Sequence, residues 1–158
     1  MIITFALTRQ NFLPCNIIYH NTMKLNTQNQ SNYYNILLAD DDEDDCLFFK
    51  EALTDLFIPA SVNMVSNGVE LMRYLESNLN NLPNVLFMDL NMPRKTGYEC
   101  LSEIKKHEKL MHLPVIIFST SYNAEMADLL YEVGANYYVR KPADFKNYKA
   151  VKIGRAHV

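Results

Sequence analysis

The sequence lacks any dense cluster of lysine or arginine residues. Its 158 residues include 15 basic and 18 acidic side chains, which gives a formal charge of −3 with histidine neutral. A protein that binds nucleic acid directly usually carries a basic patch or stripe on one face. We therefore expect no direct contact with nucleic acid. A chain of this length can bury the core of one domain but not comfortably of two.

Paired cysteines and long apolar segments are also absent. The three cysteines, Cys15, Cys46 and Cys100, form no CxxC pair, so neither a disulfide framework nor a zinc site is indicated. Cys46 and Cys100 fall in expected helices and are interpreted as small buried hydrophobic residues. No apolar stretch approaches the roughly 20 residues that cross a bilayer, and the opening MIITFAL is too short for a signal-peptide core. We expect a cytoplasmic protein without membrane insertion.

Three segments of different character divide the chain. Residues 1–34 show no clean period, and the second half of this segment is rich in Asn, Gln, Ser and Thr, as in a disordered extension. Met23 is a candidate start, which would make residues 1–22 upstream sequence. Residues 35–151 show a regular alternation of apolar and amphipathic segments, as in one folded domain. Residues 152–158, KIGRAHV, match an in-frame translation of a common sequencing-library adapter, so we expect a non-native tail and a truncated last helix.

Short apolar runs alternate with amphipathic segments throughout the regular part. The apolar runs are typical of buried strands, and apolar residues at helical spacing indicate helices that pack on a sheet. The expected strands are 36–39, 61–65, 85–88, 115–118 and 137–139. The expected helices are 43–56, 68–77, 98–107 and 123–133, then one from about Asp144, with Gly134 as a C-terminal cap. The sequence predicts a doubly wound parallel α/β sheet with helices on both faces.

Acidic side chains follow two of the expected strands. Asp40 and Asp41 come directly after the first strand, and Asp89 follows the third. Ligands of open α/β sheets bind at the carboxyl ends of the strands, so we expect these carboxylates to gather at one edge. Clustered carboxylates repel one another, and oxygen ligands with room for water favour Mg²⁺. A carboxylate beside such a cation can attack phosphorus and form an acyl phosphate.

Lys141 and Ser119 end two further strands at the same edge. Most lysines are solvated, but Lys141 precedes a proline that fixes the backbone, which favours a directed ammonium. That ammonium could pair with Asp89 and later with a phosphoryl oxygen. Ser119 offers a hydroxyl to the same group. Tyr138 is expected to be a partly buried aromatic residue.

The acidic run also permits plainer interpretations. Asp42 to Asp45 suit a solvated helix start, because negative charge is favoured at helix N-termini, and Asp89 alone could cap a turn. The acids from Asp40 to Glu51 match part of a calcium-loop pattern. That pattern is disfavoured because its sixth position is Asp45 instead of glycine, and because a strand precedes it where a helix should.

Four segments together resemble the receiver domain of two-component response regulators: ILLADDDEDD, VLFMDLNMPRKTGYECL, VIIFSTS and YYVRKP. The resemblance covers Asn35 to about Val151. It is similar to stand-alone chemotaxis-type and phytochrome-associated regulators, since no output domain follows. It implies a flavodoxin-like sheet of strand order 2-1-3-4-5. It also implies a protein that is not an enzyme and that accepts a phosphoryl group from a sensor histidine kinase or a histidine phosphotransfer protein in a phosphorelay.

The same resemblance implies roles for the residues at the predicted sheet edge. Asp89 would be the phosphoacceptor. Mg²⁺ would be held by Asp40, Asp41, Asp89 and the backbone carbonyl of Asn91, with Asp41 as the direct ligand.

The resemblance further implies a switch. Ser119 would bind the phosphoryl group, Lys141 would pair with it, and Tyr138 would turn inward as Ser119 moves. The surface of the fourth helix, fifth strand and fifth helix would then change shape and bind an unidentified downstream protein. The same surface could form a homodimer.

Three other functions are compatible with a protein of this fold class. A phosphatase of the haloacid-dehalogenase type would place a second aspartate two residues after the nucleophile, where this chain has Asn91, which cannot act as an acid or base. A flavodoxin would need a phosphate-binding loop where this chain carries six acids. An inactive receiver acting only as an interaction module is disfavoured by the complete set of site residues.

Overall fold

The structure is a computed structural model that describes residues 33–55, 57–121 and 123–141. Its strands are β1 (Tyr34–Ala39), β2 (Ala60–Val65), β3 (Val85–Met88), β4 (Val115–Ser119) and β5 (Tyr137–Arg140). Its helices are α2 (Glu43–Asp55), α3 (Gly68–Ser77), α4 (Gly97–Lys106) and α5 (Ala124–Val133). The expected last helix, the tail at 152–158 and residues 1–32 of the expected extension lie outside the described residues. No helix in the described ranges is long and apolar enough to cross a membrane.

The strands form one parallel sheet, as the sequence pattern predicts, and their order, β2-β1-β3-β4-β5, is the one that the family resemblance implies. The register brings the strand ends to a common edge: Ala39 at the end of β1 pairs with Val65 of β2 and with Met88 of β3. Ser119 at the end of β4 pairs with Arg140 of β5. The residues that follow these positions therefore start from the same edge of the sheet.

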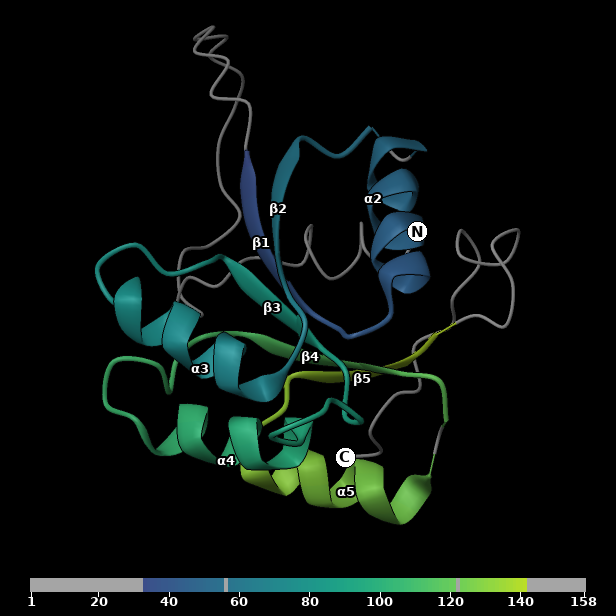
Figure 1. Cartoon of the computed structure of the whole chain (residues 1–158). Coiled ribbons are helices and arrows are strands. Elements are labelled where there is room, and N and C mark those ends of the chain that lie inside the picture. The colour runs from purple at the N-terminus through teal and green to yellow at the C-terminus, as the bar shows by residue number, and fades with distance from the viewer. Residues whose placement is uncertain (1–32, 56, 122, 142–158) are drawn as a thin grey trace, which may run out of the picture.

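The sheet is covered on both faces, as predicted from its apolar strands. Helices α3, α4 and α5 lie together on one face, and α2 lies on the other (Figure 1). Because neighbouring side chains of a strand point to opposite faces, Leu37 packs with Leu101 and Leu130 on the three-helix side, whereas Leu38 packs with Phe49 of α2. Each fully buried side chain of this size contributes about 1.5–3 kcal/mol by leaving water. The two cores fix β1 and β3, the strands that the acidic residues follow.

Side-chain caps and a glycine set the positions at which three of the helices begin or end. Asn67 and Asn123 each accept a backbone N–H three residues later, and Thr96 forms a capping box with Glu99. The Thr96 cap explains why α4 begins at Gly97, one residue before its expected start. Gly134 ends α5 with a φ of 118°, a left-handed conformation that glycine adopts without steric cost, so its predicted capping role is confirmed.

Gly97 packs directly against the backbone that carries Asp89. Its N–H donates a 2.9 Å hydrogen bond to the Leu90 carbonyl oxygen. A Cβ atom at Gly97 would overlap the Asp89 carbonyl oxygen and lie 2.9 Å from the Leu90 Cα atom. Both neighbours are backbone atoms and cannot rotate away. The absence of a side chain at Gly97 therefore lets the loop after β3 close onto α4.

We predict that Gly97→Ala lowers the free energy of unfolding by about 2 kcal/mol, because the new methyl group must displace backbone. Urea unfolding followed by circular dichroism measures the change. Lys106→Ala, at an exposed position of the same helix, is the control and should change stability by less than about 0.5 kcal/mol. A Gly97→Ala protein as stable as the parent would show that this contact does not constrain the loop.

Candidate functional site

Three carboxylates gather at the carboxyl edge of the sheet. Asp40 and Asp41 follow β1, and Asp89 follows β3. The Asp89 N–H donates to the Ala39 carbonyl oxygen at 2.9 Å, which fixes the two strand ends side by side. One carboxylate oxygen from each of the three aspartates lies within 4.8 Å of the others. The structure thus brings together the three acids that the sequence pattern singles out.

The three acids differ in their exposure to solvent. Asp40 and Asp89 are buried, at 3% and 7% exposure, whereas Asp41 is exposed. A groove of about 470 Å³ between α2 and the end of β2 reaches both Asp40 and Asp41. Burial raises the pKa of Asp40 to about 6, although the nearby Lys141 ammonium opposes this shift. A ligand can therefore approach the cluster from the side of Asp41.

Lys141 brings one positive charge into this cluster. Its Nζ atom lies 2.6 Å from Asp40 Oδ2, 2.9 Å from Asp45 Oδ2 and 3.4 Å from Asp89 Oδ2. Its side chain is 2% exposed. Burial alone would lower the pKa of Lys141, but hydrogen bonds to Asp40 and Asp45 raise it above its ordinary value. The ammonium is therefore charged at neutral pH, and its nearest partner is Asp40, not Asp89 as the sequence interpretation expects.

Asp45 is the residue that the sequence interpretation misses. The acidic run predicts a solvated side chain here, and Asp42, Glu43 and Asp44 are indeed exposed. Asp45 instead turns toward the sheet, where its side chain is 18% exposed and contacts Lys141. A signal was available: Asp45 falls on the same helix face as the buried Phe49, four residues later.

The run is also no calcium loop. Helix α2 begins at Glu43 and continues through Glu51, so the segment from Asp40 to Glu51 is mostly helical. A calcium loop of this type must instead wrap its ligands around the ion. The calcium-binding alternative is therefore excluded by the fold.

Ser119 lies fully buried at the end of β4, and its Oγ atom has no hydrogen-bond partner among the described residues. An unsatisfied buried hydroxyl costs free energy. Its backbone carbonyl accepts a 2.8 Å hydrogen bond from the Lys141 N–H, which joins these two residues. The hydroxyl is therefore a free donor at the same sheet edge.

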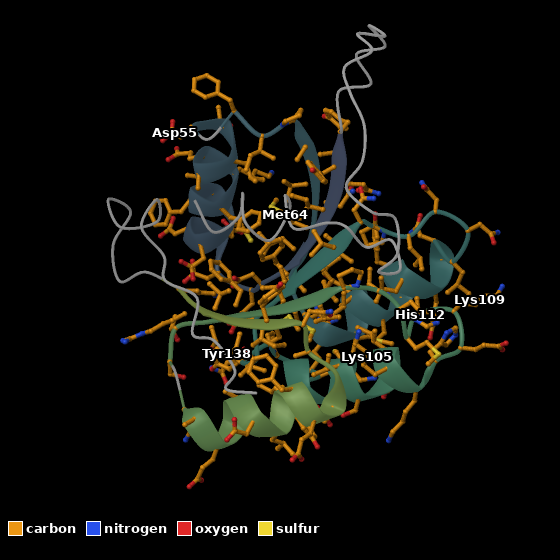
Figure 2. All side chains as sticks on the ribbon, turned by 180° about the vertical axis from the view of Figure 1, so that it is seen from behind. Asp55, Met64, Lys105, Lys109, His112 and Tyr138 are labelled. Carbon is orange, nitrogen blue, oxygen red and sulfur yellow. The ribbon has the colours of Figure 1, made fainter. Side chains whose placement is uncertain are left out.

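Tyr138 is fully inside the protein, where the sequence predicts only partial burial. It is 2% exposed, and its side chain lies between the sheet and α5 (Figure 2). Its hydroxyl donates a 2.7 Å hydrogen bond to the carbonyl oxygen of Ser121, in the loop that leaves β4. Tyr138 therefore links β5 to the segment that follows Ser119.

Asn91 is exposed in the loop after β3. The Leu90 N–H donates to Asp89 Oδ1 at 2.7 Å, and Met92 is buried, so the loop is anchored on both sides of Asn91. No described contact places the Asn91 carbonyl in the carboxylate cluster. Its role as a ligand remains a prediction.

The carboxylate cluster suits a hard divalent cation. Its donors are all oxygen atoms, and apart from the Lys141 ion pair, Asp40 Oδ2 has no hydrogen-bond partner among the described residues. The Cys46 thiol is not among the grouped ligand atoms, and burial raises its pKa to about 11. This chemistry favours Mg²⁺ or Mn²⁺ over zinc.

We predict that Ser119→Ala leaves stability unchanged or raises it by up to about 1 kcal/mol, because the lost hydroxyl is buried without a partner. Asn67→Ala is the matched control. Asn67 is also buried, but its side chain caps α3, so its loss should cost about 1 kcal/mol. Urea denaturation of both variants compares them. A large loss of stability in Ser119→Ala would mean that the hydroxyl has a structural partner.

Known proteins show the same fold and similar sequence. The profile of the response regulator receiver domain matches residues 36–151. The response regulator Rcp1 of Synechocystis is 32% identical over 116 residues, which span 71% of this chain and 79% of that protein. The phosphorylated cyanobacterial phytochrome response regulator RcpA superposes with a TM-score of 0.68 at 33% identity, covering 75% of this chain and 87% of its own. The Mn²⁺-bound form of Rcp1 gives a TM-score of 0.67 at 30% identity, covering 74% and 87%. The chain therefore belongs to the response regulator receiver domain family.

Proposed function

We propose that this receiver domain accepts a phosphoryl group on Asp89 from a histidine kinase or a histidine phosphotransfer protein. The observation that carries the proposal is the placement of Asp89, whose carboxylate lies within reach of two further carboxylates and of the Lys141 ammonium. In the transfer, the N–P bond of a phosphohistidine breaks as an O–P bond to Asp89 forms. The released imidazole nitrogen keeps the electron pair.

Mg²⁺ is the proposed cofactor, held by Asp40, Asp41, Asp89 and the backbone carbonyl of Asn91. When bound, the cation would neutralise charge on the carboxylates and on the incoming phosphoryl oxygens. The oxygen-only donor set supports this assignment. So does the presence of Mn²⁺ in the structure of the similar protein Rcp1.

The residues around Asp89 would orient and retain the phosphoryl group. The Ser119 hydroxyl, which has no partner among the described residues, would donate to one phosphoryl oxygen. Lys141 would pair with another, since its ammonium already lies 3.4 Å from Asp89 Oδ2. Ser119 is the last residue of β4, and Lys141 directly follows the neighbouring strand β5, so both start from the same part of the sheet edge.

Phosphorylation would then bias a surface between two states. Movement of Ser119 toward the phosphoryl group would shift the loop after β4, to which Tyr138 is bonded through the Ser121 carbonyl. The affected surface would comprise α5, β5 and the helix expected after Asp144, which lies outside the described residues. A downstream protein, or a second copy of this chain, would bind there.

The remaining assignments follow from the same proposal. The protein would act in the cytoplasm, as a signalling component without an enzymatic reaction of its own. The similarity to RcpA, a phytochrome response regulator, makes a phytochrome-type histidine kinase the first donor to test. Phosphotransfer profiling against the histidine kinases of the source genome would identify the donor.

We predict that Asp89→Asn abolishes labelling by acetyl phosphate in the presence of Mg²⁺, because the amide lacks a nucleophilic oxygen anion. Intact-protein mass spectrometry, which detects the added phosphoryl group, measures the result. Asp128→Asn, an exposed position on α5, carries the same charge change and should be labelled like the parent. Undiminished labelling of Asp89→Asn would refute the assignment.

We further predict that Lys141→Ala still accepts the phosphoryl group but switches poorly. The phosphoryl oxygen would lose its ammonium partner, so the phosphorylated site would stabilise the shifted conformation of the loop after β4 less strongly. Amide NMR shifts of Tyr138 and Ser121 on addition of Mg²⁺ and beryllofluoride, a phosphoryl mimic, report the switch. Shifts in Lys141→Ala as large as those of the control Lys109→Ala would contradict this role.

A further inference from the structure

The ion pair between Asp45 and Lys141 lies beside the carboxylate cluster, but Asp45 contributes no ligand atom to that cluster. Asp45 is the third residue of α2, and its Oδ2 atom lies 2.9 Å from the Lys141 ammonium. The two side chains are 18% and 2% exposed, so water screens this contact only weakly. Asp45 is not one of the three acids whose oxygens lie together.

The first turn of α2 directs Asp45 toward Lys141. The Asp42 carboxylate accepts the N–H of Asp44 at 2.9 Å and that of Asp45 at 3.2 Å, so it caps the helix. This cap fixes the backbone from which the Asp45 side chain extends. The positive end of the helix dipole also attracts a carboxylate in this turn.

Lys141 has as many carboxylate neighbours as it has N–H donors. A lysine ammonium has three donors, and its contacts are Asp40, Asp45 and Asp89. Asp40 and Asp89 both belong to the carboxylate cluster. Lys141 and a bound cation therefore compete for Asp40 and Asp89. Asp45 is the one partner of Lys141 among these three that the cation does not claim.

We propose that Asp45 is a positioning residue that retains the Lys141 ammonium when Asp40 turns to the divalent cation. The inference rests on the proposed function, because it presumes a cation at Asp40, Asp41 and Asp89. With Asp45 present, the ammonium keeps a strong partner after Asp40 leaves it. Without Asp45, Lys141 would hold Asp40 and Asp89 more tightly, and the cation would bind more weakly.

The experiment compares cation binding by the full chain and its variants, using calorimetric titration with Mg²⁺ alone and with Mn²⁺ alone. Asp45→Asn should raise the dissociation constant about fivefold, the range of coupling expected between contacting residues. Asp44→Asn removes the same charge from the same turn but from an exposed side chain. It should raise the constant by less than about twofold, as expected for a screened charge. Asp45→Glu, which keeps the carboxylate, should stay close to the parent.

A second comparison separates positioning from a structural effect. In a Lys141→Met background, Asp45→Asn and Asp44→Asn should change the dissociation constant equally, because Asp45 acts through the ammonium. A loss of helix stability would persist in that background, whereas the positioning effect would vanish. If Lys141→Met does not fold, the comparison of Asp45→Asn, Asp44→Asn and Asp45→Glu still decides the question.

The outcomes distinguish the inference from the function on which it rests. If the parent protein binds neither Mg²⁺ nor Mn²⁺, the proposed cation site fails, and this inference fails with it. If the parent binds cations and Asp45→Asn behaves like Asp44→Asn, only the positioning role of Asp45 is overturned. A specific loss in Asp45→Asn that Asp45→Glu restores supports the role.

Discussion

A single buried ammonium holds the carboxyl edge of this sheet together. Lys141 contacts carboxylates that arrive from β1, α2 and β3, and its side chain is 2% exposed. Two unit charges 4 Å apart interact by about 4 kcal/mol at an effective dielectric constant near 20. Three aspartates contact this one lysine, and a fourth, Asp41, lies beside two of them, so the edge carries more negative than positive groups. Burial of this edge raises the pKa of Asp40 to about 6, although Lys141 opposes the shift. The same excess makes the edge suitable for a divalent cation.

The parallel sheet explains how residues so far apart in sequence meet. Each strand delivers its last residues to one edge, and the two cores prevent the strands from sliding, since a shift by one residue would move every side chain of a strand to the opposite face and mismatch both cores. At the site end of the sheet, this register pairs Ala39 of β1 with Met88 of β3, and Ser119 of β4 with Arg140 of β5. Gly97 adds a local constraint, because only a residue without a side chain lets the loop after Asp89 close against α4.

Much of this arrangement could be predicted from the sequence. Apolar runs bounded by turn residues gave the five strands, and residues at strand ends gave Asp40, Asp41, Asp89, Ser119 and Lys141 as a group, because strand ends must share an edge. The position of Asp45 could not be predicted in this way. The available signal was helical spacing, since Asp45 lies on the same face of α2 as the buried Phe49, and the Asp42 cap fixes the first turn of the helix.

The full burial of Tyr138 did not follow from the residue pattern, which predicts only partial burial, since the two neighbouring tyrosines of β5 differ only in the face of the sheet to which they point. Tyr138 is buried against α5, while Tyr137 is only half-buried on the other face.

The acidic run after β1 illustrates that the order of like residues can matter more than their number. Asp40 pairs with Lys141, Asp41 faces the solvent-open groove, Asp42 caps a helix, and Asp45 reaches back to the lysine. These tasks are distributed by backbone geometry and not by side-chain chemistry, which is the same in all four. Inserting or deleting one residue in this run would leave its charge almost unchanged. Each carboxylate would nevertheless move to a position with a different role.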